Sequence, residues 1–252
     1  MREKNVKLVI AYNGSRFYGW QRQKNENSVQ GTIEKALKKI TGEDIKITGC
    51  GRTDSKVHAI SYVANFRIET SLTTEQIKKA LNSNLPTDIH IKSAEIVDHT
   101  FHSRYSAKRK TYRYLIVYEE RSPFLQGLAC YIKGKLNVED MKKAAAYFTG
   151  THNFSAFQAA GSKIKDTKRT VYKITIRKEK LTLDPEVKVI SIEITADGFL
   201  YKMARNIVGT LIYAGLGKLS IKEIPKLIAS GDRKKVPPTA PPEGLYLKEV
   251  VY

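Results

Sequence analysis

A short glycine-containing segment, GCGRTDSKVHA at residues 49–59, holds the side chains best suited to chemistry in this sequence. Arg52 and Asp54 stand two residues apart, so both side chains lie on one side of the chain if the backbone is extended. A carboxylate held near a positive charge stays ionised and can act as a nucleophile or a base. The alternative is a structural turn in which the Asp54 carboxylate accepts backbone hydrogen bonds. Chemistry alone favours the turn.

A second segment, residues 104–113, mixes positively charged and aromatic side chains. Cations suit contacts with phosphate, and aromatic rings suit stacking on bases. The alternative is a run of charges that is only solvated. Because the run leads directly into Tyr112, we predict RNA contacts for four of its cations: Arg104, Lys108, Arg109 and Lys110.

The only tryptophan of the chain, Trp20, is followed directly by Gln21, Arg22 and Gln23. These polar neighbours favour a loop that faces RNA, in which the Trp20 ring and the Arg22 cation contact the substrate. The alternative is that Trp20 belongs to the hydrophobic core.

The charge balance of the chain favours a polyanionic partner. Its 252 residues include 44 Lys and Arg but only 25 Asp and Glu, which leaves a net charge of +19. Such a surface attracts polyanions, and each phosphate that it neutralises releases counterions. A basic protein whose charge serves only solubility is the alternative. Nucleic acid is the partner that we favour.

Other classes of partner and site have little support in the sequence. The longest apolar stretch, residues 207–216, is too short to span a bilayer, and the N-terminal residues offer no signal-peptide core. Cys50 and Cys130 are far apart, and together with five His residues they give no zinc-binding spacing. We therefore expect a cytoplasmic protein with free thiols, no metal and no membrane partner.

The elements that position the segment 49–59 follow a regular order in the first half of the chain. Alternating or β-branched runs predict strands at residues 6–12, 44–48, 61–68 and 89–97. Helical spacing predicts helices over residues 29–40, after an N-cap at Ser28, and from a cap at Thr73 or Thr74 through Leu81. The order is βαββαβ, which is the ferredoxin-like arrangement.

The second half repeats this order with longer loops. Strands are predicted at residues 111–118, 170–177, 187–196 and 245–251, and helices at residues 138–148, 201–214 and 221–229. The sequence thus predicts an α+β fold with two ferredoxin-like halves and antiparallel sheets, joined around a central basic cleft. We expect an N-terminal domain at residues 1–104, which carries the Asp54 loop, and a C-terminal domain at residues 105–252, which completes the cleft.

Seven short motifs, in register along nearly the whole chain, make the sequence similar to the bacterial tRNA pseudouridine synthase A family. The GRTD motif at residues 51–54, followed by VHA at 57–59, resembles the signature of that family. The other six motifs are YNG with YGWQRQ (12–14, 18–23), NLPTDI (84–89), FHSR with SA (101–104, 106–107), YRY (112–114), MARNIVG (203–209) and EGLYL (243–247).

The resemblance implies a role for five residues. Asp54 matches the aspartate that drives cleavage of the uridine glycosidic bond, either by adding to the sugar or by abstracting a ribose proton. Arg52 matches an arginine that helps to extrude the target nucleotide, because a stacked base must be flipped before it can react. Tyr112 matches the tyrosine that stacks on the uracil, and Arg205 an arginine that pairs with the carboxylate. Leu245 lines the uracil pocket.

For three of these residues the alternative is an ordinary structural role. Tyr112 could be an ordinary strand aromatic, Arg205 a surface charge and Leu245 a core side chain. An arginine in the apolar helix around Arg205 would nevertheless be costly without an acidic partner.

The chain departs from the family pattern directly after the aspartate, where Ser55-Lys56 replaces Ala-Gly. Lys56 thus stands where a glycine could need a positive φ angle. As an extra cation beside the loop, Lys56 could also contact phosphate, so we include it among the substrate-binding residues.

The activity implied by the resemblance is isomerisation of uridine to pseudouridine at positions 38, 39 and 40 of the tRNA anticodon stem-loop. It implies no cofactor, a homodimer, and tRNA rather than DNA as the partner. Two alternatives stay open. One is a paralogous pseudouridine synthase that acts on another RNA, and the other is an RNA-binding module without catalysis.

Overall fold

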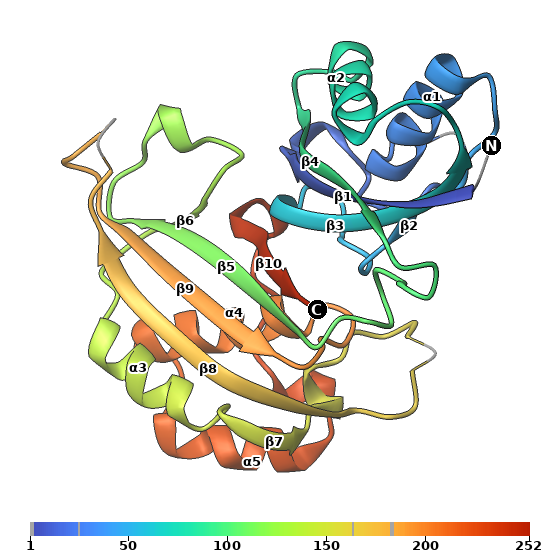
Figure 1. Ribbon diagram of the computed structural model, residues 1–252. Coiled ribbons are helices and arrows are strands. Elements are labelled where there is room, and N and C mark those ends of the chain that lie inside the picture. The colour runs from blue at the N-terminus through green and yellow to red at the C-terminus, as the bar shows by residue number, and fades with distance from the viewer. Residues whose placement is uncertain (1–2, 25, 163, 182–183) are drawn as a thin grey trace. The chain divides into compact units, whose positions relative to one another are not determined.

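The computed structural model describes residues 3–24, 26–162, 164–181 and 184–252, and it divides the chain into two compact units (Figure 1). Unit 1 comprises Met1–Lys108 together with Tyr246–Tyr252, and unit 2 comprises Arg109–Leu245. The first break falls four residues beyond the expected domain boundary at residue 104. The second break, after Leu245, has no counterpart in the sequence prediction.

Unit 1 is a sheet with two helices on one face (Figure 1). In chain order its elements are β1 (Glu3–Tyr12), α1 (Val29–Thr41), β2 (Thr48–Gly49), β3 (His58–Glu69), α2 (Thr74–Asn84) and β4 (Ile89–Val97). Strand β1 lies between β4 and β3 and is antiparallel to both, and β2 pairs with the other edge of β3. The core is formed by fully buried aliphatic side chains, among them Leu8, Ile10, Ile33, Leu37, Leu81 and Ile91.

Local signals in the sequence determine where the helices of unit 1 begin and end. The Ser28 side chain accepts a hydrogen bond from the Gly31 N–H at 3.2 Å, which caps α1. Gly42 ends the helix in the left-handed conformation, with φ 79°. Thr73 and Gln76 form a reciprocal capping box at the start of α2.

The strands of unit 2 lie side by side in the order β5-β9-β8-β7, and β6 pairs in parallel with β5. Its strands are β5 (Arg109–Tyr118), β6 (Cys130–Ile132), β7 (Gly150–Asn153), β8 (Lys168–Glu179) and β9 (Val189–Ala196). Its helices are α3 (Val138–Ala146), α4 (Met203–Gly215) and α5 (Ile224–Ser230), and they lie on one side of the sheet (Figure 1). The expected α+β class is therefore confirmed, and most strand pairs are antiparallel.

The strand β10 (Leu245–Val251) has a pairing that the sequence does not predict. The sequence predicts that it closes the second half, but Tyr246 and Leu247 pair in parallel with His58 and Ala59 of β3, so these residues belong to unit 1. Strand pairing between residues this far apart in sequence leaves no local pattern, which is why the order of elements alone does not predict that β10 pairs with β3.

None of the helices in the described part of the chain has the length and apolar character that crossing a membrane requires.

Candidate active site

The segment between β2 and β3 is held in place along most of its length by other parts of unit 1. The Tyr12 and Thr53 hydroxyls are hydrogen bonded at 2.9 Å, and the Thr53 carbonyl accepts the Trp20 N–H at 3.3 Å. The Tyr62 hydroxyl donates to the Gly51 carbonyl. The Phe17 carbonyl accepts the Lys56 N–H at 3.2 Å. The loop is thus fixed on both sides of Asp54.

Close backbone packing explains the two glycines opposite this loop. A Cβ atom on Gly14 would lie 2.0 Å from the Val57 carbonyl oxygen, and one on Gly19 would lie 2.3 Å from the Thr53 carbonyl oxygen. Gly19 also has φ 87°, which favours glycine. The segment that carries Tyr18 and Trp20 can therefore lie directly against the loop that contains Asp54.

Within this fixed loop the predicted reactive side chains keep access to solvent. Asp54 is half-buried, whereas Arg52 and Lys56 are exposed. The Asp54 carbonyl accepts the Val57 N–H at 3.2 Å, so a tight turn follows the carboxylate. Lys56 has φ 64°, the left-handed conformation that a glycine would adopt without strain. Lys56 thus adopts a positive φ angle, the conformation that a glycine at this position could need.

His58 is a further residue at this site that the sequence interpretation did not single out. It is buried at the start of β3, where its Nδ1 accepts the Gly14 N–H at 3.0 Å. Its ring stacks on Tyr246 of β10, with ring centroids 4.6 Å apart. His58 therefore ties the end of the Asp54 loop to two other segments of unit 1. The VHA motif contains this residue, but nothing in the motif distinguishes a structural histidine from a reactive one.

Trp20 occupies a different environment from the one expected. Its side chain is only 2% exposed and stacks on Tyr62, with ring centroids 4.0 Å apart. Gly49 leaves room for this pair, since a Cβ atom there would lie 2.6 Å from the indole. The polar neighbours of Trp20 lie outside the core while the indole points inward. We therefore do not retain Trp20 among the proposed RNA contacts.

The remaining predicted RNA contacts differ in their surroundings. Arg22 is exposed but forms an ion pair with Glu34 of α1, at 3.1 Å. In unit 1, Arg104 and Lys108 are exposed, and the Arg104 guanidinium lies 5.6 Å from the centre of the Tyr105 ring. At the start of β5 in unit 2, Arg109 is exposed and Lys110 is half-buried.

In unit 2, Arg205 lies in α4 and is almost completely buried, with an exposed fraction of 9%. Its Nε donates to the Ala240 carbonyl at 2.8 Å, and the Ala240 N–H donates to the Arg205 carbonyl at 3.1 Å. A Cβ atom on Gly209 would lie 2.1 Å from the Pro238 carbonyl oxygen, so the glycine lets the loop pack on the helix. Arg205 is therefore fixed by the proline-rich loop 236–242 and is not a surface charge.

A polar cluster, formed by Asn206, Arg233 and Thr239, fastens this loop to α4. The Arg233 guanidinium donates to the Asn206 Oδ1 at 3.1 Å and to the Thr239 Oγ1 at 2.9 Å. It also donates to the Val236 and Pro237 carbonyls, at 2.8 and 3.2 Å. Desolvation lowers the pKa of Arg233 from its ordinary value. Sequence reasoning missed this cluster, although an asparagine next to an arginine in an apolar helix was a usable signal.

Tyr112 and Leu245 are close in sequence to Tyr114 and Gly244, which lie against each other. Tyr112 and Tyr114 are two residues apart in β5 and so share a face of the sheet. The Tyr114 hydroxyl donates to the Pro241 carbonyl at 2.8 Å, and its ring would contact any Cβ on Gly244. Tyr112 is half-buried and packs edge-on against Phe199, with ring centroids 4.8 Å apart. Leu245 directly follows Gly244 and is buried.

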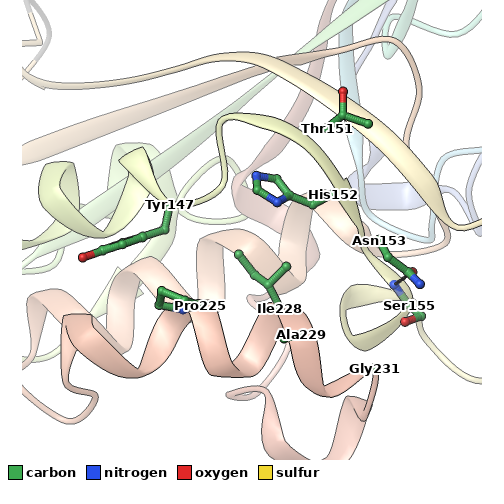
Figure 2. A pocket seen from close by; sticks show the side chains of 9 residues that line it. All are labelled: Tyr147, Thr151, His152, Asn153, Ser155, Pro225, Ile228, Ala229 and Gly231. Carbon is green, nitrogen blue, oxygen red and sulfur yellow. Dashed lines mark hydrogen bonds between the residues drawn. The ribbon is translucent and has the colours of Figure 1, made fainter.

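A hollow of about 460 Å³ lies elsewhere in unit 2, between β7, the end of α3, and α5 (Figure 2). Its lining combines Tyr147 and His152 with apolar side chains of α5, such as Ile228. None of the side chains that the sequence singles out for chemistry lines this hollow.

Comparison with known proteins identifies the family of the chain. The family model described as tRNA pseudouridine synthase matches residues 8–106 and 144–252. The protein called tRNA pseudouridine synthase A in Thermoanaerobacter sp. (strain X514) is 48% identical over 250 residues, which cover 99% of this chain and 100% of the relative. The protein of that name in Acetivibrio thermocellus is 47% identical over 251 residues, with the same coverage.

The protein called tRNA pseudouridine synthase A 2 in Clostridium perfringens (strain 13 / Type A) is 45% identical over 250 residues, which cover 99% of this chain and 100% of the relative. All three relatives align along essentially their full length, and the family model spans sequence from both units. The chain therefore belongs to the tRNA pseudouridine synthase family.

Proposed function

We propose that this protein isomerises uridine to pseudouridine in tRNA and that Asp54 is its catalytic carboxylate. The observation that carries the proposal is the fixed loop of unit 1, which holds a half-buried Asp54 beside the exposed Arg52 in a chain of this family. A rigid support of this kind suits catalysis, because a reacting group must be held close to its productive position.

The reaction needs no external reactant. The bond between C1′ and N1 of uridine breaks, the base rotates, and C1′ bonds to C5. The proton lost from C5 is balanced by the one that N1 gains. In one route the Asp54 carboxylate adds to C1′ and leaves again, and in the other it abstracts a ribose proton and returns it. Both routes require a carboxylate that is ionised at the start.

Four further residues have supporting roles in the proposal. Arg52 helps to expose the target nucleotide, since the reacting atoms of a stacked base are screened. Tyr112 stacks on the extruded uracil, Leu245 lines its pocket, and Arg205 pairs with the carboxylate. The hold of loop 236–242 on Arg205 supports the last role, because a fixed guanidinium loses little freedom when it forms an ion pair.

The substrate and assembly are part of the same proposal. We propose positions 38, 39 and 40 of the anticodon stem-loop as the targets, a homodimer as the active form, and the cytoplasm as the compartment. We further propose phosphate contacts for Arg22, Arg104, Lys108, Arg109, Lys110 and Lys56. The net charge of +19 supports these contacts, and a chain with only two cysteines, both buried, fits a reducing compartment.

The proposal is tested with tRNA transcripts that contain only uridine. Wild-type protein should form pseudouridine in the anticodon arm, which chemical mapping locates. Asp54→Asn should form none but should bind the transcript with near-normal affinity, because the amide keeps the size of the side chain and removes only its charge and basicity. Equal activity of both proteins would refute the role of Asp54.

The same experiment separates the alternatives. Product outside the anticodon arm would indicate a synthase for other sites, an alternative toward which the Ser55-Lys56 departure leans. Binding without product in either protein would instead indicate an RNA-binding module and would refute the proposed activity.

A further inference from the structure

A loop of unit 1 presents an aromatic ring to solvent. Tyr105 is 77% exposed, which is the largest exposed fraction among the large hydrophobic side chains in the described part of the chain. It belongs to residues 101–106, called the Tyr105 loop below, which connect β4 to the strand β5. A tyrosine so exposed contributes little to the core, so its position has to be explained by something other than packing.

The residues around Tyr105 are anchored firmly. Ser103 is fully buried, and its N–H donates to the Asn65 Oδ1 at 2.9 Å, while its hydroxyl donates to the Thr48 carbonyl at 2.7 Å. The Ser103 carbonyl accepts the Tyr252 hydroxyl at 2.7 Å. Every polar group of Ser103 is thus bonded to another part of unit 1.

The loop is also closed internally. The His102 N–H donates to the Ser106 Oγ at 3.1 Å, and the Ser106 N–H donates to the His102 carbonyl at 2.9 Å. The His102 Nδ1 accepts the N–H groups of Arg104 and Tyr105, at 3.1 and 3.3 Å. The backbone that carries Tyr105 is therefore fixed before any ligand binds.

A second ring and a cation lie close to the Tyr105 ring. The His102 ring is 4.3 Å from the Tyr105 ring between centroids, with an interplanar angle of 35°. The Arg104 guanidinium lies 5.6 Å from the Tyr105 centroid. Lys108, two residues beyond the loop, is exposed. A flat apolar surface with positive charge beside it matches a base with its attached phosphate.

We propose that the Tyr105 loop binds an unpaired base of the RNA substrate, with Tyr105 stacked on the base and Arg104 at the adjoining phosphate. This site lies outside the proposed Asp54 loop and rests on the proposed function for the identity of the RNA. The cations beside the ring favour RNA over an apolar protein surface. Because the ring is held in advance, binding a base costs little conformational entropy.

Binding of a tRNA transcript to variants of Tyr105 tests the proposal. Tyr105→Leu should raise Kd on the order of tenfold, because it removes a stacking surface. Tyr105→Phe should stay within about twofold of wild type, since the ring alone is required. Tyr147→Leu is the matched control: Tyr147 is 41% exposed in unit 2, and its replacement should leave Kd unchanged. All three variants should unfold near the wild-type temperature, because the replaced side chains are exposed.

The salt dependence of binding distinguishes stacking from a general loss of affinity. In a plot of log affinity against log salt, Tyr105→Leu should give a line parallel to wild type, because no phosphate contact is lost. Arg104→Gln should reduce the slope by about one, as expected for one lost phosphate contact. A changed slope for Tyr105→Leu would contradict stacking.

A fully paired RNA duplex provides a second test, since it offers no free base. Tyr105→Leu should bind the duplex as wild type does, and an equal loss on duplex and tRNA would overturn the proposal. The proposal would also be overturned if Tyr105→Leu bound tRNA with wild-type affinity. These outcomes are separate from the proposed function: absence of pseudouridine with wild-type protein refutes the activity, whereas the Tyr105 loop is judged by binding alone.

Discussion

Removal of the Arg233 guanidinium should loosen the loop that fixes Arg205. Arg233→Met keeps most of the length and the apolar stem of the side chain, but it removes four hydrogen bonds of 2.8 to 3.2 Å. Asn206 and Thr239 still bond to each other, because the Thr239 hydroxyl donates to the Asn206 Oδ1 at 2.6 Å. The substitution therefore weakens the hold on the loop and leaves the bond between Thr239 and Asn206 intact.

The expected loss of stability follows from the number and exposure of these bonds. A hydrogen bond from a charged donor contributes about 1.5–3 kcal/mol net. Arg233 is only half-buried, so water can replace part of what is lost, and the four bonds share one side chain. We expect a loss of about 2–3 kcal/mol, which lowers the unfolding temperature by about 5–10 °C for a protein of this size. Lys234→Met, at the exposed neighbouring residue, should change stability by less than about 0.5 kcal/mol.

The effect on catalysis depends on the hydrogen bond between the Arg205 Nε and the Ala240 carbonyl. If the proposed role of Arg205 is correct, Arg233→Met should slow single-turnover formation of pseudouridine at a temperature where the variant is folded, with little change in tRNA affinity. An unfolding temperature equal to that of Lys234→Met would refute the stability reasoning. Normal turnover in a destabilised variant would show that the loop does not position Arg205 for the reaction.

Three further predictions concern the loop, the core and alkaline pH. Lys56→Gly should raise the free energy of unfolding, measured by urea denaturation, by about 0.5–1 kcal/mol. Relief of the strained φ of 64° stabilises the folded state by about 1–2 kcal/mol, and the greater freedom of glycine in the unfolded chain offsets part of this gain. An unchanged denaturation midpoint would contradict strain at this residue. Gly49→Ala should lower the free energy of unfolding by about 1–3 kcal/mol and alter the near-ultraviolet circular dichroism of Trp20, because the new methyl group overlaps the Trp20–Tyr62 pair. A wild-type spectrum and wild-type stability would argue against this close packing. Burial raises the pKa of Cys130 from an ordinary value near 9 to about 11, so the folded state holds its proton longer than the unfolded state and stability should fall as pH rises from about 9 to 11. Cys130→Ala should make that decline in stability shallower. Identical pH profiles of stability for the variant and the wild type would exclude a contribution from Cys130.

Elements with strong local signals were predictable from the sequence. The strands β4 and β10 have the predicted bounds, and each begins directly after a turn residue, Asp88 or Gly244. Helix α1 begins directly after Ser28, whose capping role follows from its residue type and place. A positive φ at Lys56 was one of the possibilities that the departure from the Ala-Gly pattern raised, and the backbone has it. In each of these cases a few neighbouring residues determine the outcome.

Features that depend on distant contacts were not predictable in this way. Strands β6 and β7 have three and four residues, too few for a periodic pattern, and are held by β5 and β8. The indole of Trp20 points inward because Gly49 leaves space under it, and the immediate neighbours of Trp20 do not reveal that space. Arg233 meets Asn206 only after the intervening helix and loop have folded.

The return of β10 to unit 1 has a consequence for the order in which the protein can mature on the ribosome. Unit 2 is one continuous stretch, Arg109–Leu245, whereas unit 1 also needs Tyr246–Tyr252, which are synthesised after all of unit 2. Tyr246 stacks on His58 beside the Asp54 loop, and the Tyr252 hydroxyl supports Ser103 under Tyr105. A nascent chain that stalls within unit 2 lacks both supports. We therefore expect such fragments to leave the proposed catalytic and RNA-binding loops unfinished, so that translation itself delays activity until both units have been made.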